Sequence, residues 1–206
     1  LHSTSRRQRQ MCIRDSFRAI EAYYSVDATA QNARNGVWVK GPRKPFIDAI
    51  KKQASSALLI AEDLGIITDE VISLIKYSGF PSMRVFQFAF DGDKNSPHLP
   101  HNYPANCIAY TGTHDNNTLL GFVWEMDEQK RKDMLNYLGF SGDWNCCYSE
   151  IMRTLLASHA NLVIFPVQDI LGFGADTRLN TPGVATGNWR FRITKEQLDS
   201  VDTDDL

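Results

Sequence analysis

Short apolar runs of strand length alternate along the chain with segments in which apolar residues recur every three or four positions. The strand-like runs cover residues 57–61, 83–90, 107–110 and 162–167. The helix-like segments cover residues 45–54, 68–78, 116–124, 128–138 and 148–159. Helices between strands predict parallel βαβ units, and strands that are apolar at nearly every position predict burial of both faces of the sheet. The pattern therefore indicates the α/β class.

Polar residues follow three of the four predicted strands. Glu62 and Asp63 follow the first, the segment 111–117 follows the third, and Asp169 comes shortly after the fourth. In parallel sheets, and above all in (β/α)8 barrels, the carboxyl ends of the strands carry the active site. One such carboxylate taken alone is as often a helix cap as a catalytic group. Three such motifs together favour an enzyme.

Two of these carboxylates suit glycoside chemistry, in which one group moves a proton and another attacks or stabilises the anomeric carbon. Glu62 directly follows an apolar strand, so partial desolvation would raise its pKa toward neutrality and make it the candidate acid/base. Asp115 lies between His114 and Asn116, and this polar neighbourhood should keep it ionised. Aromatic residues such as Trp189 could stack on sugar faces, although a single aromatic residue is more often part of a core.

Composition and charge exclude several classes of protein. Of the 206 residues, 43% are hydrophobic and 22% are charged, which is too apolar for a disordered chain. The net charge of −2 provides no basic field for nucleic acid. No apolar stretch approaches the roughly 18 residues of a membrane helix, so we expect neither a nucleic-acid nor a membrane partner. Four cysteines without a CxxC pair fit a reducing cytoplasm.

A metal site is the alternative that the histidines raise. His98, His101, His114 and Asp115 are all possible ligands of a hydrolytic metal ion. Pro100 lies between His98 and His101, so the two imidazoles should not share a helix face, and no HExxH motif accompanies them. Because GxGxxG and GxxxxGK[ST] motifs are also missing, we expect neither a metal nor a nucleotide cofactor.

Several long motifs in a fixed order resemble one known family. They are IAEDLGIIT at 60–68, HLPHNYP at 98–104, YTGTHDNNT at 110–118, PVQDILG at 166–172, NTPG at 180–183 and GNW at 187–189. The chain resembles, over residues 17–193, the C-terminal half of the 4-alpha-glucanotransferases, also called amylomaltases or disproportionating enzymes. The resemblance implies the C-terminal part of a (β/α)8 barrel, which needs eight strands where only four are legible here. We therefore expect a truncated barrel that is inactive by itself.

The resemblance also implies an activity and its residues. Members of the family transfer alpha-1,4-glucan segments, with retention of configuration, from a maltodextrin or a starch- or glycogen-derived donor to glucose or another glucan. They need no metal or organic cofactor. By resemblance Glu62 is the general acid/base and Asp115 stabilises the transition state. The expected substrate-binding residues are His114, Asn116, Arg18, His101, Asn180 and Trp189.

The nucleophile motif departs from the family pattern. The family reads Arg-Ile-Asp-His-Phe-Arg, whereas residues 13–18 read Ile-Arg-Asp-Ser-Phe-Arg. Asp15 is the nucleophile by position, with Ile13 and Ser16 in place of the arginine and the histidine. The first sixteen residues hold four arginines and one acidic residue, and the composition changes at Phe17. We predict that residues 1–16 are a non-native or disordered leader and that residues 194–206 are an acidic tail.

Two other functions stay open at this point. One is an alpha-glucan hydrolase of the same barrel group, which would release sugar from maltotriose without making longer products. The other is a non-catalytic glucan-binding fragment, which the altered motif around Asp15 allows.

Overall fold

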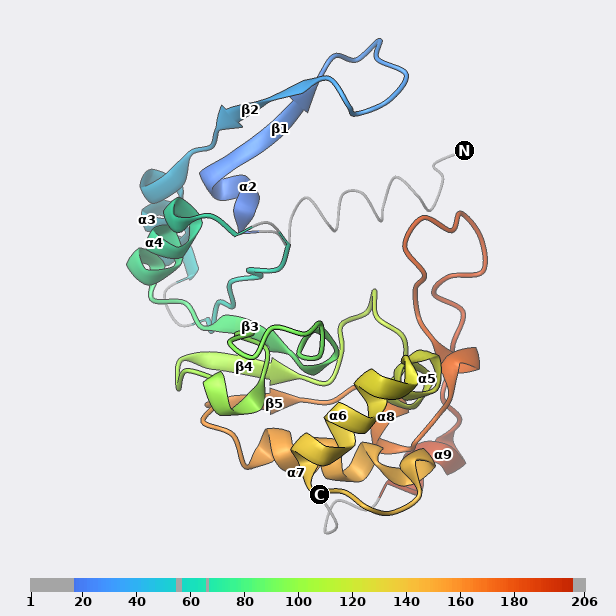
Figure 1. Ribbon diagram of the computed structural model, residues 1–206. Coiled ribbons are helices and arrows are strands. Elements are labelled where there is room, and N and C mark those ends of the chain that lie inside the picture. The colour runs from blue at the N-terminus through green and yellow to red at the C-terminus, as the bar shows by residue number, and fades with distance from the viewer. Residues whose placement is uncertain (1–16, 55–56, 66, 202–206) are drawn as a thin grey trace. The chain divides into compact units, whose positions relative to one another are not determined.

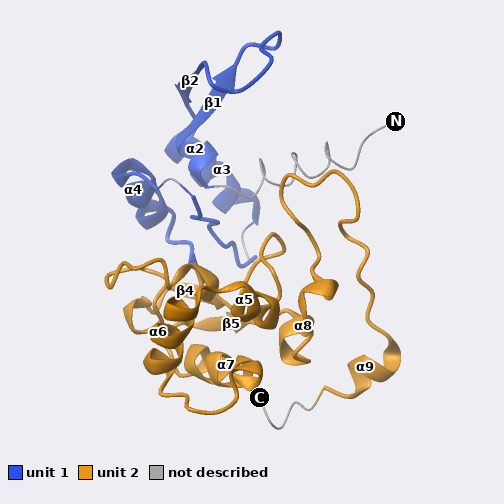
Figure 2. Ribbon diagram, turned by 45° about the vertical axis from the view of Figure 1, so that its right-hand side comes forward, with its two compact units in different colours: residues 1–83 blue, residues 84–206 orange. Residues whose placement is uncertain are grey.

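The computed structural model describes residues 17–54, 57–65 and 67–201. The chain forms two compact units, residues 1–83 and residues 84–206 (Figure 2). Its described elements include helices, short 3-10 turns and strands in two separate sheets (Figure 1). The strands combine with helices as the α/β pattern predicts.

The first unit packs three helices around a small core. It contains α2 (Arg18–Glu21), α3 (Arg43–Ala54) and α4 (Asp69–Ser78). The core is formed by buried apolar residues from several segments, two of them from α4: Phe17, Ile47, Ala61, Val71 and Leu74. Both α3 and α4 coincide within two residues with segments predicted from the helical period.

An antiparallel hairpin in the first unit was missed by the sequence analysis. It pairs β1 (Ala22–Val26) with β2 (Gly36–Lys40), and Tyr24 lies opposite Trp38. Both strands are rich in β-branched and aromatic residues, but residues 27–35 separate them, so the sequence contains no two-residue turn of the kind that marks a hairpin. Runs of apolar residues do not reveal this hairpin, because most of its side chains are exposed.

The second sheet has the strand order β3-β4-β5. Its strands are β3 (Ser82–Val85), β4 (Cys107–Tyr110) and β5 (Leu162–Ile164). The β4 and β5 strands are parallel, with Ala109 opposite Val163. Three helices lie between these strands in the chain: α5 (Leu119–Glu125), α6 (Glu128–Leu138) and α7 (Tyr148–Leu156). This arrangement confirms the predicted parallel pairing.

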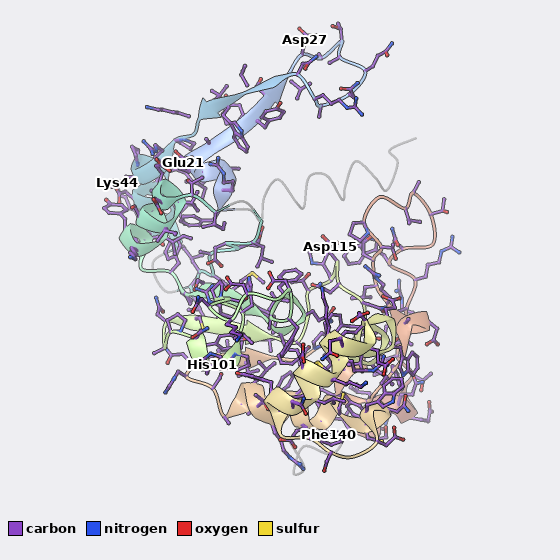
Figure 3. All side chains as sticks on the ribbon, in the orientation of Figure 1. Glu21, Asp27, Lys44, His101, Asp115 and Phe140 are labelled. Carbon is purple, nitrogen blue, oxygen red and sulfur yellow. The ribbon has the colours of Figure 1, made fainter. Side chains whose placement is uncertain are left out.

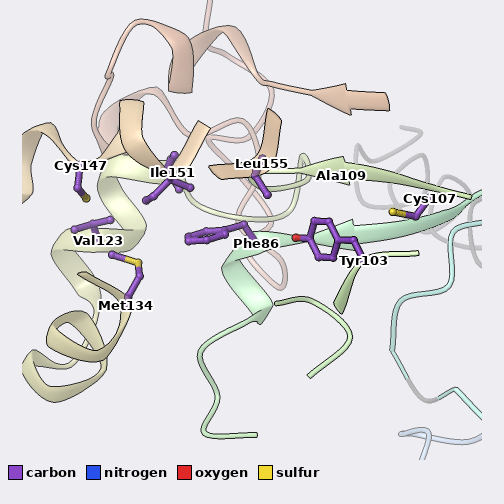
Figure 4. Close-up of a cluster of buried hydrophobic side chains, with 10 residues drawn as sticks. Phe86, Tyr103, Cys107, Ala109, Val123, Met134, Cys147, Ile151 and Leu155 are labelled. Carbon is purple, nitrogen blue, oxygen red and sulfur yellow. The ribbon is translucent and has the colours of Figure 1, made fainter. Parts of the chain in front are cut away.

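The core of the second unit joins β4 to these three helices (Figure 4). Ala109 of β4, Val123 of α5, Met134 of α6 and Ile151 of α7 are all fully buried. Each helix therefore turns one apolar stripe toward the sheet. The bounds of β4 and of α6 are those that the sequence predicts.

Two predicted strands are wrong in part. Of residues 57–61, only Ala61 pairs, through an isolated parallel bridge to Ser82, while Leu58 is exposed. The run at 83–90 stays extended only to Val85 and then turns into a 3-10 helix at Phe86–Phe88. An apolar run records burial but not hydrogen bonding, so it cannot show where pairing stops.

The last predicted strand, residues 162–167, is also shorter than expected. Pairing ends at Ile164, and Pro166, which has no N–H to donate, precedes the short helix α8 (Val167–Ile170). The predicted burial of both faces holds for β4 but not for β5, where Leu162 and Ile164 are exposed. The strand order places β5 at one end of the described sheet.

The segment after α8 has little regular structure. It contains a 3-10 turn at Ala175–Thr177 and the helix α9 (Lys195–Asp199), which begins with a capping box between Thr194 and Gln197. Between them the chain is fixed by side chains, since Asn188 hydrogen bonds to both the N–H and the carbonyl of Thr181. Within the described residues, no helix is long and apolar enough to span a membrane.

The N-cap of α6 gives a prediction about local stability. Asp127 Oδ1 accepts hydrogen bonds from the N–H groups of Gln129 and Lys130. Asp127→Ala should cost about 1 kcal/mol, so amide exchange in the first turn of α6 should accelerate about fivefold. Asp127→Asn keeps the capping oxygen and serves as the control. Equal exchange in all three proteins would contradict the capping role.

Candidate functional site

The loop after β4 carries the candidate site of the second unit. Asp115 lies in this loop, at residues 111–118 (Figure 3). Its Oδ1 accepts a hydrogen bond from Asn180 Nδ2 at 2.5 Å, and His114 Nε2 lies 3.4 Å from the same oxygen. The imidazole of His114 faces the indole of Trp189, with 5.5 Å between ring centroids. Four of the predicted site residues therefore form one cluster.

A buried carboxylate holds both ends of this loop. Asp169 is 2% exposed, and its two oxygens accept from different segments: Oδ2 from the Thr111 hydroxyl at 2.5 Å and Oδ1 from the Leu119 N–H at 2.7 Å. Burial raises the pKa of Asp169, and these two hydrogen bonds oppose that increase. A carboxylate at a strand end could instead cap the helix that follows it, but Asp169 does not: it lies within α8, and the N-cap of α5, whose first N–H it accepts, is Thr118.

The loop is also held from the side of β3. The N–H of Gln87 donates to the carbonyl of Thr111 at 3.3 Å, and the Gln87 side chain donates to the carbonyl of Asn117 at 2.8 Å. Gly112 leaves room for this contact, because a Cβ there would lie 2.6 Å from Gln87 Nε2. A larger residue at this position would displace the glutamine.

The side chain of Asn116 stabilises the conformation of the loop. Its Oδ1 accepts from the N–H and the hydroxyl of Thr113, at 2.9 and 2.8 Å. Its own N–H donates back to the Thr113 carbonyl. The expected role of Asn116 in substrate binding stays a prediction. In the structure its side-chain oxygen, Oδ1, is bonded within the loop to Thr113.

His101 does not join the Asp115 cluster. It lies in the 3-10 turn Pro100–Asn102, and its Nδ1 is 2.8 Å from the hydroxyl of Tyr137 on α6. Figure 3 shows His101 and Asp115 at different places in the second unit. A pocket of about 600 Å³ borders this histidine, and its lining includes Phe90, Leu99, His101, Lys130, Asp133 and Tyr137.

Glu62 belongs to the first unit. It follows Ala61, the one residue of its predicted strand that pairs, and its side chain is half-buried. Its Oε1 accepts from the Leu64 N–H at 3.0 Å, and its carbonyl accepts from the Phe17 N–H at 2.8 Å. The neighbouring Asp63 holds the start of β3 through the Met83 N–H. Hydrogen bonds thus fix Glu62 beside an isolated bridge, whereas the sequence predicts a full strand before it.

Arg18 is engaged within the first unit. Its guanidinium donates to Glu21 at 2.5 Å and lies 4.2 Å from the centroid of the Trp38 ring. Glu21 also accepts from Arg43 at 3.0 Å. The expected nucleophile, Asp15, lies outside the described residues.

The three histidines weighed as metal ligands lie in separate settings. His98 Nδ1 accepts from the Val85 N–H, His101 contacts Tyr137, and His114 packs on Trp189. Among the described residues, no group of three His, Cys, Asp or Glu side chains is placed to hold a metal ion.

One residue of the cluster was missed by the sequence analysis. Arg178 Nη2 donates to the carbonyl of Asp115 at 2.7 Å, and its Nε donates to the carbonyl of Asn180 at 2.8 Å. Both acceptors are backbone carbonyls, which every residue has, so the residue types in the sequence do not indicate this contact. Its position two residues before Asn180 is the one signal that the sequence offers.

Comparison with known proteins decides the family. The family model described as 4-alpha-glucanotransferase matches residues 6–198. The chain belongs to the 4-alpha-glucanotransferase family. The match includes the motif around Asp15 as well as Glu62, Asp115 and Asn180. The resemblance inferred from the motifs is therefore confirmed.

Curated relatives carry the name of this family and are longer than this chain. The 4-alpha-glucanotransferase of Synechocystis is 44% identical over 89% of this chain, and the chloroplastic/amyloplastic one of Arabidopsis thaliana is 40% identical over 94%. The chain spans 37% of the first and 34% of the second, or about a third of the length of these 4-alpha-glucanotransferases.

Solved structures show the same α/β fold. An amylomaltase from Streptococcus agalactiae in complex with acarbose superposes with a TM-score of 0.84 at 32% identity, over 92% of this chain and 40% of that one. The amylomaltase of Corynebacterium glutamicum is 14% identical, with a TM-score of 0.61 over 82% of this chain and 30% of its own, and shows likeness of fold alone.

The burial of Asp169 predicts a dependence of stability on pH. Its pKa in the folded chain is raised above the ordinary 3.8, so its contribution to stability is complete below pH 3.8 and declines as pH rises through the raised value. Asp169→Asn should remove this decline and keep the Leu119 contact. Asp169→Ala leaves two buried donors unpaired and should cost about 1–3 kcal/mol.

Urea unfolding at a series of pH values measures both effects. Asp176→Ala, at an exposed position of the same segment, is the control and should change stability by less than about 0.5 kcal/mol. An unchanged pH profile in Asp169→Asn would show that this carboxylate titrates as it does in the unfolded chain.

Proposed function

We propose that this chain is the segment of a 4-alpha-glucanotransferase that carries its acid/base and its transition-state-stabilising carboxylate. The observation that supports the proposal is the setting of Asp115. Asn180 and His114 both approach its Oδ1, and no hydrogen bond from the described residues reaches its Oδ2. One oxygen is thus held by the protein while the other can face a ligand.

The proposed reaction has two steps. In the first, Asp15 attacks the anomeric carbon of an alpha-1,4-glucan, and Glu62 protonates the glycosidic oxygen as the bond to the leaving chain breaks. In the second, Glu62 takes the proton from a hydroxyl of the acceptor sugar, which attacks the anomeric carbon and releases Asp15. The negative charge of Asp115 stabilises the cationic sugar ring in both transition states.

The proposal assigns recognition of the sugar to residues beside Asp115. An imidazole can bind sugar hydroxyls, which suits His114, and an indole can pack against a sugar face, which suits Trp189. Asn180 is 1% exposed and bonded to Asp115 Oδ1, so it would act on the sugar through Asp115 and not by direct contact. Asn116, Arg18 and His101 are carried over from the family resemblance alone. The donor is a maltodextrin or a longer glucan, and the acceptor is glucose or another glucan.

We propose further that residues 17–193 are the C-terminal part of a (β/α)8 barrel. The greater length of the relatives supports this, as do the exposed Leu162 and Ile164 of β5, which lie on one face of the strand and suit a face that further parts of a barrel would cover. The leader at 1–16, the tail at 194–206 and the cytoplasmic location stay predictions. The chain alone should be inactive, because half of the barrel strands would be missing.

Product analysis with maltotriose separates this function from the alternatives. The full-length protein that contains this chain should form glucose together with maltodextrins longer than maltotriose. Glucose and maltose without longer products would identify a hydrolase. The altered residues Ile13 and Ser16 favour a second candidate, a glucan-binding protein without turnover, which would bind maltotriose and leave it unchanged.

The acid/base role of Glu62 is tested by replacing its carboxyl group with an amide, which cannot transfer a proton. Glu62→Gln in the full-length protein should abolish transfer from maltotriose and leave maltotriose binding nearly unchanged, because the amide keeps the shape but cannot shuttle a proton. Glu128→Gln, at an exposed position of α6, is the matched control and should behave as wild type. Turnover near the wild-type rate in Glu62→Gln would refute the assignment.

Asp115 is tested by removing its charge. Asp115→Asn keeps an oxygen for Asn180 but loses the charge directed at the developing cation, so kcat should fall by roughly 10²-fold or more. Asp127→Asn, at the exposed start of α6, should leave kcat unchanged. A decrease of only a few fold in Asp115→Asn would assign this carboxylate to the loop rather than to the reaction.

A further inference from the structure

We propose that Arg178 is a positioning residue that sets the orientation of the Asp115 carboxylate; this inference rests on the function proposed above. Its guanidinium joins two parts of the second unit that are far apart in sequence. Nη2 donates to the carbonyl of Asp115 at 2.7 Å, and Nε donates to the carbonyl of Asn180 at 2.8 Å. Both residues of the Asp115–Asn180 pair are therefore held at their backbones by one side chain.

The chemistry of arginine suits this task. A guanidinium is planar, and its donors point in fixed directions, so two acceptors bound by it are fixed relative to each other. A lysine ammonium is a single point on a flexible stem and does not impose the same geometry. The two contacts of Arg178 therefore set the distance between the loop at 111–118 and the segment that carries Asn180.

That distance decides how the carboxylate of Asp115 is oriented. Asn180 is 1% exposed, and its amide donates to Asp115 Oδ1 at 2.5 Å. While this pair is in place, Oδ1 is occupied and Oδ2 is the oxygen left for the sugar. Loss of Arg178 frees both backbones, and a displacement of about 1 Å at a reacting group can cost about 10²-fold in rate.

Leu179, the residue after Arg178, holds Trp189 of the cluster in a similar way. The carbonyl of Leu179 accepts from the N–H of Trp189 at 2.6 Å. Trp189 has a φ of 64°, which is uncommon for a residue other than glycine and persists where neighbouring contacts enforce it. Three consecutive residues therefore hold the cluster: Arg178 bonds the Asp115 backbone, Leu179 bonds the Trp189 backbone, and Asn180 bonds the Asp115 carboxylate.

Steady-state kinetics on the full-length protein distinguish positioning from a general contribution to stability. Arg178→Met should lower kcat for transfer from maltotriose by about 10²-fold, with KM within about twofold of wild type. Arg153→Met, at an exposed position of α7, is the matched control and should leave both constants unchanged. An unchanged kcat in Arg178→Met, or a raised KM with kcat retained, would overturn the proposal.

Chemical rescue adds a readout that a purely structural role does not move. In Arg178→Ala, added guanidinium ion at low concentration should restore part of kcat, because it can occupy the vacated position and bind the same two carbonyls. The Arg153→Ala protein should show no such gain. Arg178→Lys should recover less than the added guanidinium does. Full activity in Arg178→Lys would show that a charge suffices and would contradict the geometric argument.

A crystal structure of the Arg178→Met protein tests the positioning independently of activity. We expect the amide of Asn180 to leave Asp115 Oδ1, whereas an unchanged hydrogen bond would refute the proposed role. If the wild-type protein transfers no sugar, the proposed function fails, and this structure still decides whether Arg178 sets the carboxylate.

Discussion

The loop that carries Asp115 depends on one buried carboxylate. Asp169 bonds the hydroxyl of Thr111 at the beginning of the loop and the N–H of Leu119 at its end. A buried carboxylate is costly unless its oxygens are bonded, and both oxygens of Asp169 are. The loop therefore cannot open without leaving a charge, a hydroxyl and an amide unpaired in the interior.

This constraint explains how a loop can hold a group with the precision that catalysis needs. Asp169 fixes the two ends, Gln87 holds the carbonyl of Asn117, and Arg178 holds the carbonyl of Asp115 in between. Preorganised charges act on a transition state only when neighbouring residues lock them in place. Asp169 lies in α8 and Arg178 in the irregular segment that follows it, so the site depends on the part of the chain after β5.

Local pattern in the sequence predicts some parts of this structure and not others. The α6 helix and the β4 strand have the predicted bounds because each presents apolar residues to the core of the second unit, Met134 from α6 and Cys107 and Ala109 from β4. The hairpin of β1 and β2 was missed because it is held by pairing rather than by burial. In the site, motifs brought out Asp115 and Asn180, but Arg178 bonds to backbone carbonyls, one of them 63 residues away. His101, predicted from a motif, lies beside Tyr137 because position in a motif does not report position in space.

The proposed function has Asp115 bind the glucan with one carboxylate oxygen while Asn180 holds the other. A crystal structure of the full-length protein with acarbose, the sugar analogue bound in the Streptococcus agalactiae amylomaltase, tests this most directly. We predict a hydroxyl of the ligand within hydrogen-bond distance of Asp115 Oδ2, with Asn180 still on Oδ1. A ligand bound away from Asp115, or an Asn180 amide turned to the sugar with Oδ1 released, would contradict the account.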